Sequence, residues 1–226
     1  MIISIHQPNY IPWIGYFHKI KCSDHIVFLD DVQYSKNNYI NRSKILSSSK
    51  KPKWISIPVS FKFRDNIYDI YTSENNWIEK HLNIIENYYK NSLYFELVWP
   101  DIQKIYNKLD NGMNLSLINS TIIIEIMSLL SIKTKHSFSS KYNIKSKSDM
   151  RIIEIVKNID KNGIYLSGKG GGKYQDEDKF IKNNIILQYI NFNHPTYSQL
   201  SEKFYAGLSI LDFVFNVGWK KASTLV

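Results

Sequence analysis

The chain has 226 residues, of which 43% are hydrophobic and 22% charged, values typical of a globular protein with one sizeable domain. It has no apolar run of about eighteen residues and no basic, apolar leader, so we expect neither a membrane span nor a secretory signal. The single cysteine, Cys22, excludes an internal disulfide and favours the cytoplasm.

A net charge of +9, from 29 Lys and Arg against 20 Asp and Glu, favours an anionic partner. The lysines are scattered, and residues 47–53 form the one local basic cluster. The abundance of Ile, Asn, Lys and Tyr is the bias expected of an AT-rich genome. We therefore expect no nucleic-acid binding, and the charge suits a nucleotide sugar or a phosphopantetheine arm instead.

The first thirty-one residues predict a strand, a helix and a second strand. Residues 2–5 are a short buried strand that runs into a Gln-Pro-Asn break. From Pro12 onward, apolar side chains recur at helical spacing as far as Ile20. Residues 25–31 form the second strand, which ends in two acids. A βαβ unit of this kind implies a parallel sheet.

The middle of the chain is predicted to be largely helical. Residues 53–61 alternate as a strand, in which Pro58 favours an edge position. Amphipathic helices follow over 75–91 and within 93–109, and a very apolar helix covers 114–132 with Asn114 or Ser116 as its N-cap.

In the last third of the chain, predicted helices and strands alternate again, and the final helix ends at Gly218. Helices are predicted over 148–160, 174–184 and 209–218, and strands over 163–168 and 185–192. We expect a single α/β domain over 1–226, with a Rossmann-like, open and mostly parallel sheet flanked by helices. A helical insert near 75–130 interrupts it.

Polar residues follow three of the predicted strands: His6 and Gln7, Asp30 and Asp31, and Ser167 with Gly168. In open parallel sheets, ligands bind outside the carboxyl ends of the strands, so these residues predict a site. We assign His6 as a general base and Asp30 as the carboxylate that orients it. The alternative is a structural His6 that caps its own loop. Asp31 is expected to face the opposite way.

Two further segments are candidates for anion binding. Residues 167–174, "SGKGGGKY", let backbone amides approach an anion, but they match neither phosphate-loop motif and could be an ordinary loop. Residues 36–44 supply a clamp for phosphate or carboxylate, or else a solvated basic loop. The predicted substrate-binding residues are Gln7, Asn9, Gln33, Lys36, Asn41, Arg42, Ser167, Gly168 and Tyr174.

No bound metal or tightly bound cofactor is expected. The potential ligands His6, His18, Asp30, Asp31 and His194 have none of the usual metal-binding spacings. Cys22 lies in the last turn of a predicted helix, where a thiol pKa is raised, so it is expected to be unreactive.

Several blocks of the sequence together resemble the WbqC-like family. They are "HQPNYIPWIGYFHKI", "DHIVFLDDVQYSKNNYINRSKI", "KWISIPV", "IYLSGKGGGKY", "HPTYSQL" and "LSILDFVFNVG", in order from residue 3 to about 218. Besides the residues named above, the family pattern covers His194, Tyr197, Gln199, Asp212 and Asn216.

The resemblance implies a role in surface-polysaccharide or O-antigen biosynthesis, where the family's genes typically lie. It suggests transfer of glycine or another acyl group to the amino group of a nucleotide-activated amino sugar. The acyl donor would be a carrier-protein thioester or coenzyme A, and an acyl carrier protein would then be a partner. The alternatives are a non-catalytic accessory protein that binds a sugar or a partner in the same pathway, and a nucleotidyltransferase. The oligomeric state is not predicted.

Overall fold

A computed structural model describes all residues from 1 to 226, and in it the chain forms two compact units. The first unit consists of Met1–Gln7, His18–Asp31 and Lys133–Asn193. The second consists of Pro8–Phe17, Val32–Ile132 and His194–Val226. The second unit includes the helical insert predicted near 75–130 together with flanking segments, and the assignment of the whole chain to a single domain stays a prediction.

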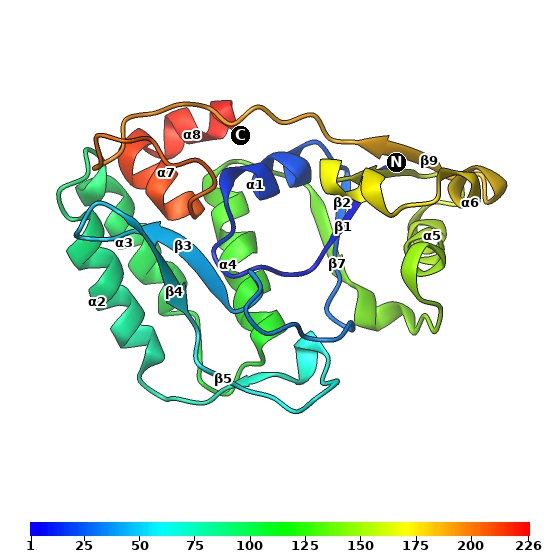
Figure 1. Cartoon of the computed structure of the whole chain (residues 1–226), viewed down its shortest axis with the longest axis horizontal. Coiled ribbons are helices and arrows are strands. Elements are labelled where there is room, and N and C mark those ends of the chain that lie inside the picture. The colour runs from blue at the N-terminus through cyan, green and yellow to red at the C-terminus, as the bar shows by residue number, and fades with distance from the viewer. The chain divides into compact units, whose positions relative to one another are not determined.

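The first unit is built on a five-stranded parallel sheet (Figure 1). Its strands stand in the order β7-β2-β1-β8-β9. Numbered along the chain, this is the 3-2-1-4-5 order of a doubly wound sheet, so the predicted Rossmann-like class is confirmed. The strands are β1 (Ile2–His6), β2 (His25–Phe28), β7 (Lys135–Phe138), β8 (Ile164–Ser167) and β9 (Ile186–Tyr189).

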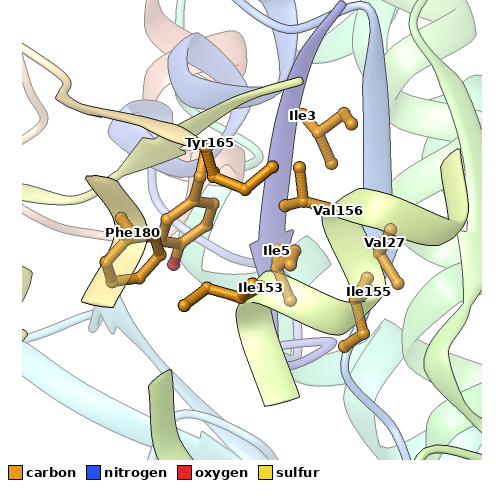
Figure 2. Close-up of a cluster of buried hydrophobic side chains, with 9 residues drawn as sticks. Ile3, Ile5, Val27, Ile153, Ile155, Val156, Tyr165 and Phe180 are labelled. Atoms are coloured by element: carbon orange, nitrogen blue, oxygen red, sulfur yellow. The ribbon is translucent and has the colours of Figure 1, made fainter. Parts of the chain in front are cut away.

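Helices α5 (Ser148–Ile159) and α6 (Glu177–Lys182) cover one face of this sheet. Figure 2 shows Ile153, Ile155 and Val156 of α5 beside Ile3 and Ile5 of β1, with Phe180 of α6 against Tyr165. Each isoleucine buried here contributes about 1.5–3 kcal/mol. Because side chains alternate along a strand, Ser4 and His6 point to the opposite face from Ile3 and Ile5.

Three further helices connect the strands of the sheet. The 3₁₀ helices η2 (Ser139–Tyr142) and η3 (Lys169–Lys173) follow β7 and β8. Helix α1 (Ile14–Lys21) begins among residues of the second unit and ends among those of the first.

The second unit combines two β-hairpins with five α-helices and one 3₁₀ helix. Its elements are β3 (Arg42–Leu46), β4 (Pro52–Ser56), β5 (Val59–Ser60), η1 (Ile67–Asp69), β6 (Tyr71–Thr72), α2 (Trp77–Tyr89), α3 (Phe95–Tyr106), α4 (Leu115–Leu129), α7 (Ile210–Val217) and α8 (Trp219–Leu225). Helix α2 buries Trp77, His81, Ile85 and Tyr89, which recur every four residues along one face.

Some helices and strands begin or end where the sequence predicts, and others do not. Helix α4 starts at the predicted N-cap, where the Asn114 side chain accepts from Leu117 N at 2.8 Å. Helix α7 ends at Gly218, whose φ of +77° favours glycine. The strand predicted over 53–61 is broken into β4 and β5, because Pro58 has no N–H to continue the ladder. No helix is both long enough and apolar enough to span a bilayer.

Candidate functional site

Three of the predicted polar segments meet at one edge of the first unit's sheet. β2, β1 and β8 are parallel neighbours, so their carboxyl ends lie together, followed by Asp30, Gln7 and Gly168 respectively. After β1, the next strands in the chain, β2 and β7, are added on one side of it, and β8 and β9 are then added on the other. The gap between β1 and β8 is therefore the topological switch point of the sheet. His6 and Ser167 are the last residues of these two strands. Ligands of doubly wound proteins bind at that position.

His6 is half-buried and neutral at neutral pH. Its Nδ1 lies 2.9 Å from the carbonyl oxygen of Gln7. Because a carbonyl only accepts, the neutral ring carries its proton on Nδ1 and a lone pair on Nε2. Burial, followed by the positive charge of Lys19, lowers the pKa of His6 to about 4. The ring is thus an acceptor throughout the physiological pH range.

Asp30 is held by the turn that follows β7. Its Oδ1 accepts from Ser139 Oγ at 3.1 Å and from Ser140 N at 3.0 Å, and its Oδ2 accepts from Ser140 Oγ at 2.9 Å. β7 lies on the other side of β2 from β1. The carboxylate therefore anchors η2, and a role of Asp30 in orienting His6 stays a prediction. Asp31 pairs with Arg151 of α5.

The loop after β8 has a packed part and an open part. A Cβ on Gly171 would lie 2.3 Å from Ser167 Oγ and 2.5 Å from Gln175 Oε1, so a side chain at that position would have to displace these two side chains. A Cβ on Gly168 or Gly170 would meet no atom within 4 Å. The buried Ser167 thus packs against the loop, and Gly168 borders open space. Tyr174 is exposed.

Lys19 is a member of this edge that the sequence reasoning missed. It lies on α1, its side chain is only 6% exposed, and its Nζ donates to the carbonyl of Ile5 at 3.1 Å. Burial lowers its pKa to about 8. The sequence feature that indicates the burial of Lys19 is its position inside the apolar stripe of the helix, three residues after Tyr16 and one before Ile20.

The direction of the Ile5 carbonyl places Lys19 at the switch point. Alternate carbonyls of a parallel strand point to opposite neighbours. The carbonyl of Met1 accepts from Ile164 N in β8, so the carbonyl of Ile5 also points towards β8. The pairing of β1 with β8 ends at Ser4 and Leu166. The ammonium of Lys19 therefore takes the position of the next donor from β8.

The remaining predicted binding residues lie in the second unit. Asn41 donates to the carbonyl of Ile57 at 3.0 Å, and Arg42 bonds to Asn37 while its guanidinium lies 4.1 Å from the Trp54 ring centroid. These two side chains brace the β3–β4 region. Gln33 and Lys36 are exposed, and the backbone of Asn9 hydrogen-bonds the Tyr16 hydroxyl. Ligand roles for these five residues stay predictions.

Residues of the family pattern near the carboxyl terminus gather around Asp212, which is fully buried. Its carboxylate accepts from Tyr197 Oη at 2.7 Å, Gln199 Nε2 at 2.8 Å and Tyr89 Oη at 3.3 Å. Burial raises the pKa of Asp212 to about 6, and these hydrogen bonds oppose the rise. We call these four residues the Asp212 network. It ties the segment before α7 to the helices.

The other candidates for chemistry are weak. Burial raises the pKa of the Cys22 thiol, which favours its unreactive form. His194 donates from Nδ1 to the carbonyl of Pro195 and accepts at Nε2 from Gly207 N, as a structural histidine does. No group of three or more His, Cys, Asp or Glu side chains is arranged to hold a metal ion.

Comparison with known proteins gives a family and one relative. The model of the WbqC-like protein family matches residues 7–224. An uncharacterized protein of Mycobacterium tuberculosis is 31% identical over 219 residues, which make up 96% of this chain and 94% of that protein. No solved structure matches the chain.

Proposed function

The chain belongs to the WbqC-like protein family, and from this premise we propose that it transfers an acyl or aminoacyl group to the amino group of a nucleotide-linked amino sugar. The observation that carries the proposal is the neutral His6 at the switch point, beside the positive charge of Lys19. The surface-polysaccharide context of the family favours an amino sugar as acceptor and glycyl as one candidate acyl group. A cytoplasmic location belongs to the same proposal.

The proposed reaction needs a base and a thioester. The sugar amine attacks the carbonyl carbon of an acyl thioester, from coenzyme A or a carrier protein. The new C–N bond forms as the C–S bond breaks. A proton from the nitrogen passes to His6 Nε2 and then to the departing thiolate, so that the products are an amide and a thiol.

The low pKa of His6 makes the free protein a poor base, because general-base catalysis works best when the pKa is near the working pH. One of the causes of that low pKa is the nearby charge of Lys19. An anionic substrate beside Lys19 would offset this charge and raise the pKa of His6. Substrate binding would thereby strengthen the base at the moment when it is needed.

The test is acyl transfer by His6→Ala and His6→Gln, with UDP- and dTDP-linked amino sugars and acyl thioesters as substrates. We expect kcat to fall about 10²–10⁴-fold, measured as release of free thiol. His136→Gln changes an exposed histidine of the same sheet and should keep the wild-type rate. Wild-type transfer by both His6 variants would remove the proposed base.

A sugar-binding accessory protein is the second candidate, and the low pKa of His6 favours it, because such a ring accepts hydrogen bonds better than protons. Thermal shifts separate the candidates. A nucleotide amino sugar that stabilises the protein without turnover would indicate the accessory role. Stabilisation by a nucleoside triphosphate with magnesium would indicate a nucleotidyltransferase instead.

A further inference from the structure

The ammonium of Lys19 is a buried charge without a counter-ion. Its Nζ has three hydrogens, and the carbonyl of Ile5 accepts one of them. No carboxylate forms an ion pair with it, although lysine side chains this buried are almost always paired. A single neutral hydrogen bond compensates poorly for the loss of water around an ammonium.

Five aspartates of the first unit have partners other than Lys19. Asp30 is held by two serines, Asp31 by Arg151, and Asp149 by Lys179. Asp160 pairs with the amino terminus, and Asp24 accepts from the backbone of Ile2. The charge at the switch point is therefore left uncompensated by the protein itself.

The position of this charge indicates what compensates it. The last β1–β8 pair is Ser4 with Leu166, and Lys19 contacts β1 just beyond it. Gly168, the first residue after β8, borders open space. A Cβ on Gly168 would meet no atom within 4 Å, so the backbone of the loop is open at this position.

We propose that the switch point between β1 and β8 binds a phosphate group, and that its anionic oxygens are the counter-charge of Lys19. The inference rests on the proposed function only for the rest of the ligand, which would be the diphosphate of the nucleotide sugar. The site is separate from the phosphate contacts predicted at Lys36 and Arg42, and the Arg42 guanidinium is engaged by Asn37 and Trp54.

The decisive variant is Lys19→Met, which keeps the apolar stem and removes the charge. Inorganic diphosphate and UDP are titrated into the wild-type and variant proteins by calorimetry. Uridine serves as the control without phosphate, and glycine as the control that carries a carboxylate. We expect the wild type to bind diphosphate and UDP, and the variant to bind both at least about tenfold more weakly. Uridine should not bind measurably, which places the affinity in the phosphates.

The matched control is Lys182→Met, which removes an equal charge from an exposed position on α6. It should bind diphosphate within about twofold of wild type, since a lone surface charge contributes little. The ligand-free Lys19→Met protein should also have a higher Tm than wild type, because an unpaired buried charge has been removed. A structural lysine would give the opposite change in Tm.

Wild-type affinity for diphosphate in Lys19→Met, or binding of glycine alone, would overturn the site. If Lys19→Met does not fold, the Nζ resonance of Lys19 in the wild-type protein must move on titration with diphosphate while that of Lys182 does not. Diphosphate binding without acyl transfer would keep this site and remove the transferase proposal. Undiminished acyl transfer by Lys19→Met would keep the transferase proposal and remove this phosphate site.

Discussion

The two units each bury a charged group, and the two groups are treated in opposite ways. In the second unit, the carboxylate of Asp212 accepts from three side chains. In the first, the ammonium of Lys19 has one acceptor and no acid. The Asp212 carboxylate is held by side chains of its own unit, whereas the Lys19 ammonium has a single carbonyl partner, and we propose that a ligand supplies its counter-charge. A sequence pattern does not tell these two kinds of buried charge apart, whereas the hydrogen-bond partners in the structure do.

The largest effect is expected for Asp212→Ala, which leaves the buried donors of Tyr197, Gln199 and Tyr89 without their acceptor. The free energy of unfolding should fall by about 3 kcal/mol or more. Urea denaturation followed by tryptophan fluorescence measures it. This signal reports on the second unit, which contains all five tryptophans: Trp13, Trp54, Trp77, Trp99 and Trp219.

The control for this variant is Glu202→Ala, an exposed acid in the segment before α7, which should change stability by no more than about 0.5 kcal/mol. A loss below about 1 kcal/mol in Asp212→Ala would break the comparison, because the network would then not be structural.

The second effect is a pH dependence of opposite sign in the two units. The pKa of Asp212 is raised from 3.8 to about 6, so its contribution to stability is greatest below pH 3.8 and is lost as the pH rises through 6. Relative to Asp212→Asn, the wild type should therefore lose about 2 kcal/mol between pH 4 and pH 6. Urea titrations across this range, with the variant as reference, measure the difference.

His6 should behave the other way. Its pKa is lowered from 6.5 to about 4, so its contribution is complete above pH 6.5 and is lost as the pH falls through 4. Relative to His6→Gln, the wild type should lose stability on acidification. Amide hydrogen exchange of the β1 residues measures this loss. Curves of the same sign for both pairs of proteins would contradict the assignment.

The smallest effect sharpens the comparison within the loop after β8. Gly171→Ala should lower the free energy of unfolding by about 1–3 kcal/mol, because the new Cβ would overlap Ser167 and Gln175. Gly170→Ala is the matched variant, and it should be neutral or stabilising by up to about 1 kcal/mol. Circular dichroism during urea denaturation measures both. Equal losses would show that the whole loop is packed.

Parts of the fold could be predicted because they have local signals. The strand at 2–5, the Asn114 cap and the stop at Gly218 each rest on a few neighbouring residues. β7 was not predicted, since Lys135, His136 and Ser137 give a strand no apolar pattern and it lies at the sheet edge. Its pairing with β2 depends on residues more than about a hundred positions apart.

The site shows the same limit. The sheet edge with His6 and Gly168 could be predicted, because parallel strands gather their carboxyl ends. The partner of Asp30 could not, because Ser139 and Ser140 come from the unpredicted strand end. Lys19 was missed because a helical pattern does not say that a lysine inside the stripe is buried.

The interleaving of the two units has a consequence for synthesis on the ribosome. β1 is the central strand, yet β8 is completed about 160 residues later. At about 5–20 residues per second, one side of β1 stays unpaired for roughly 10–30 s after it is made. During this interval much of the second unit has already emerged. We therefore expect the nascent chain to expose an unpaired strand edge until β8 is made, and to be sensitive to truncation before β8.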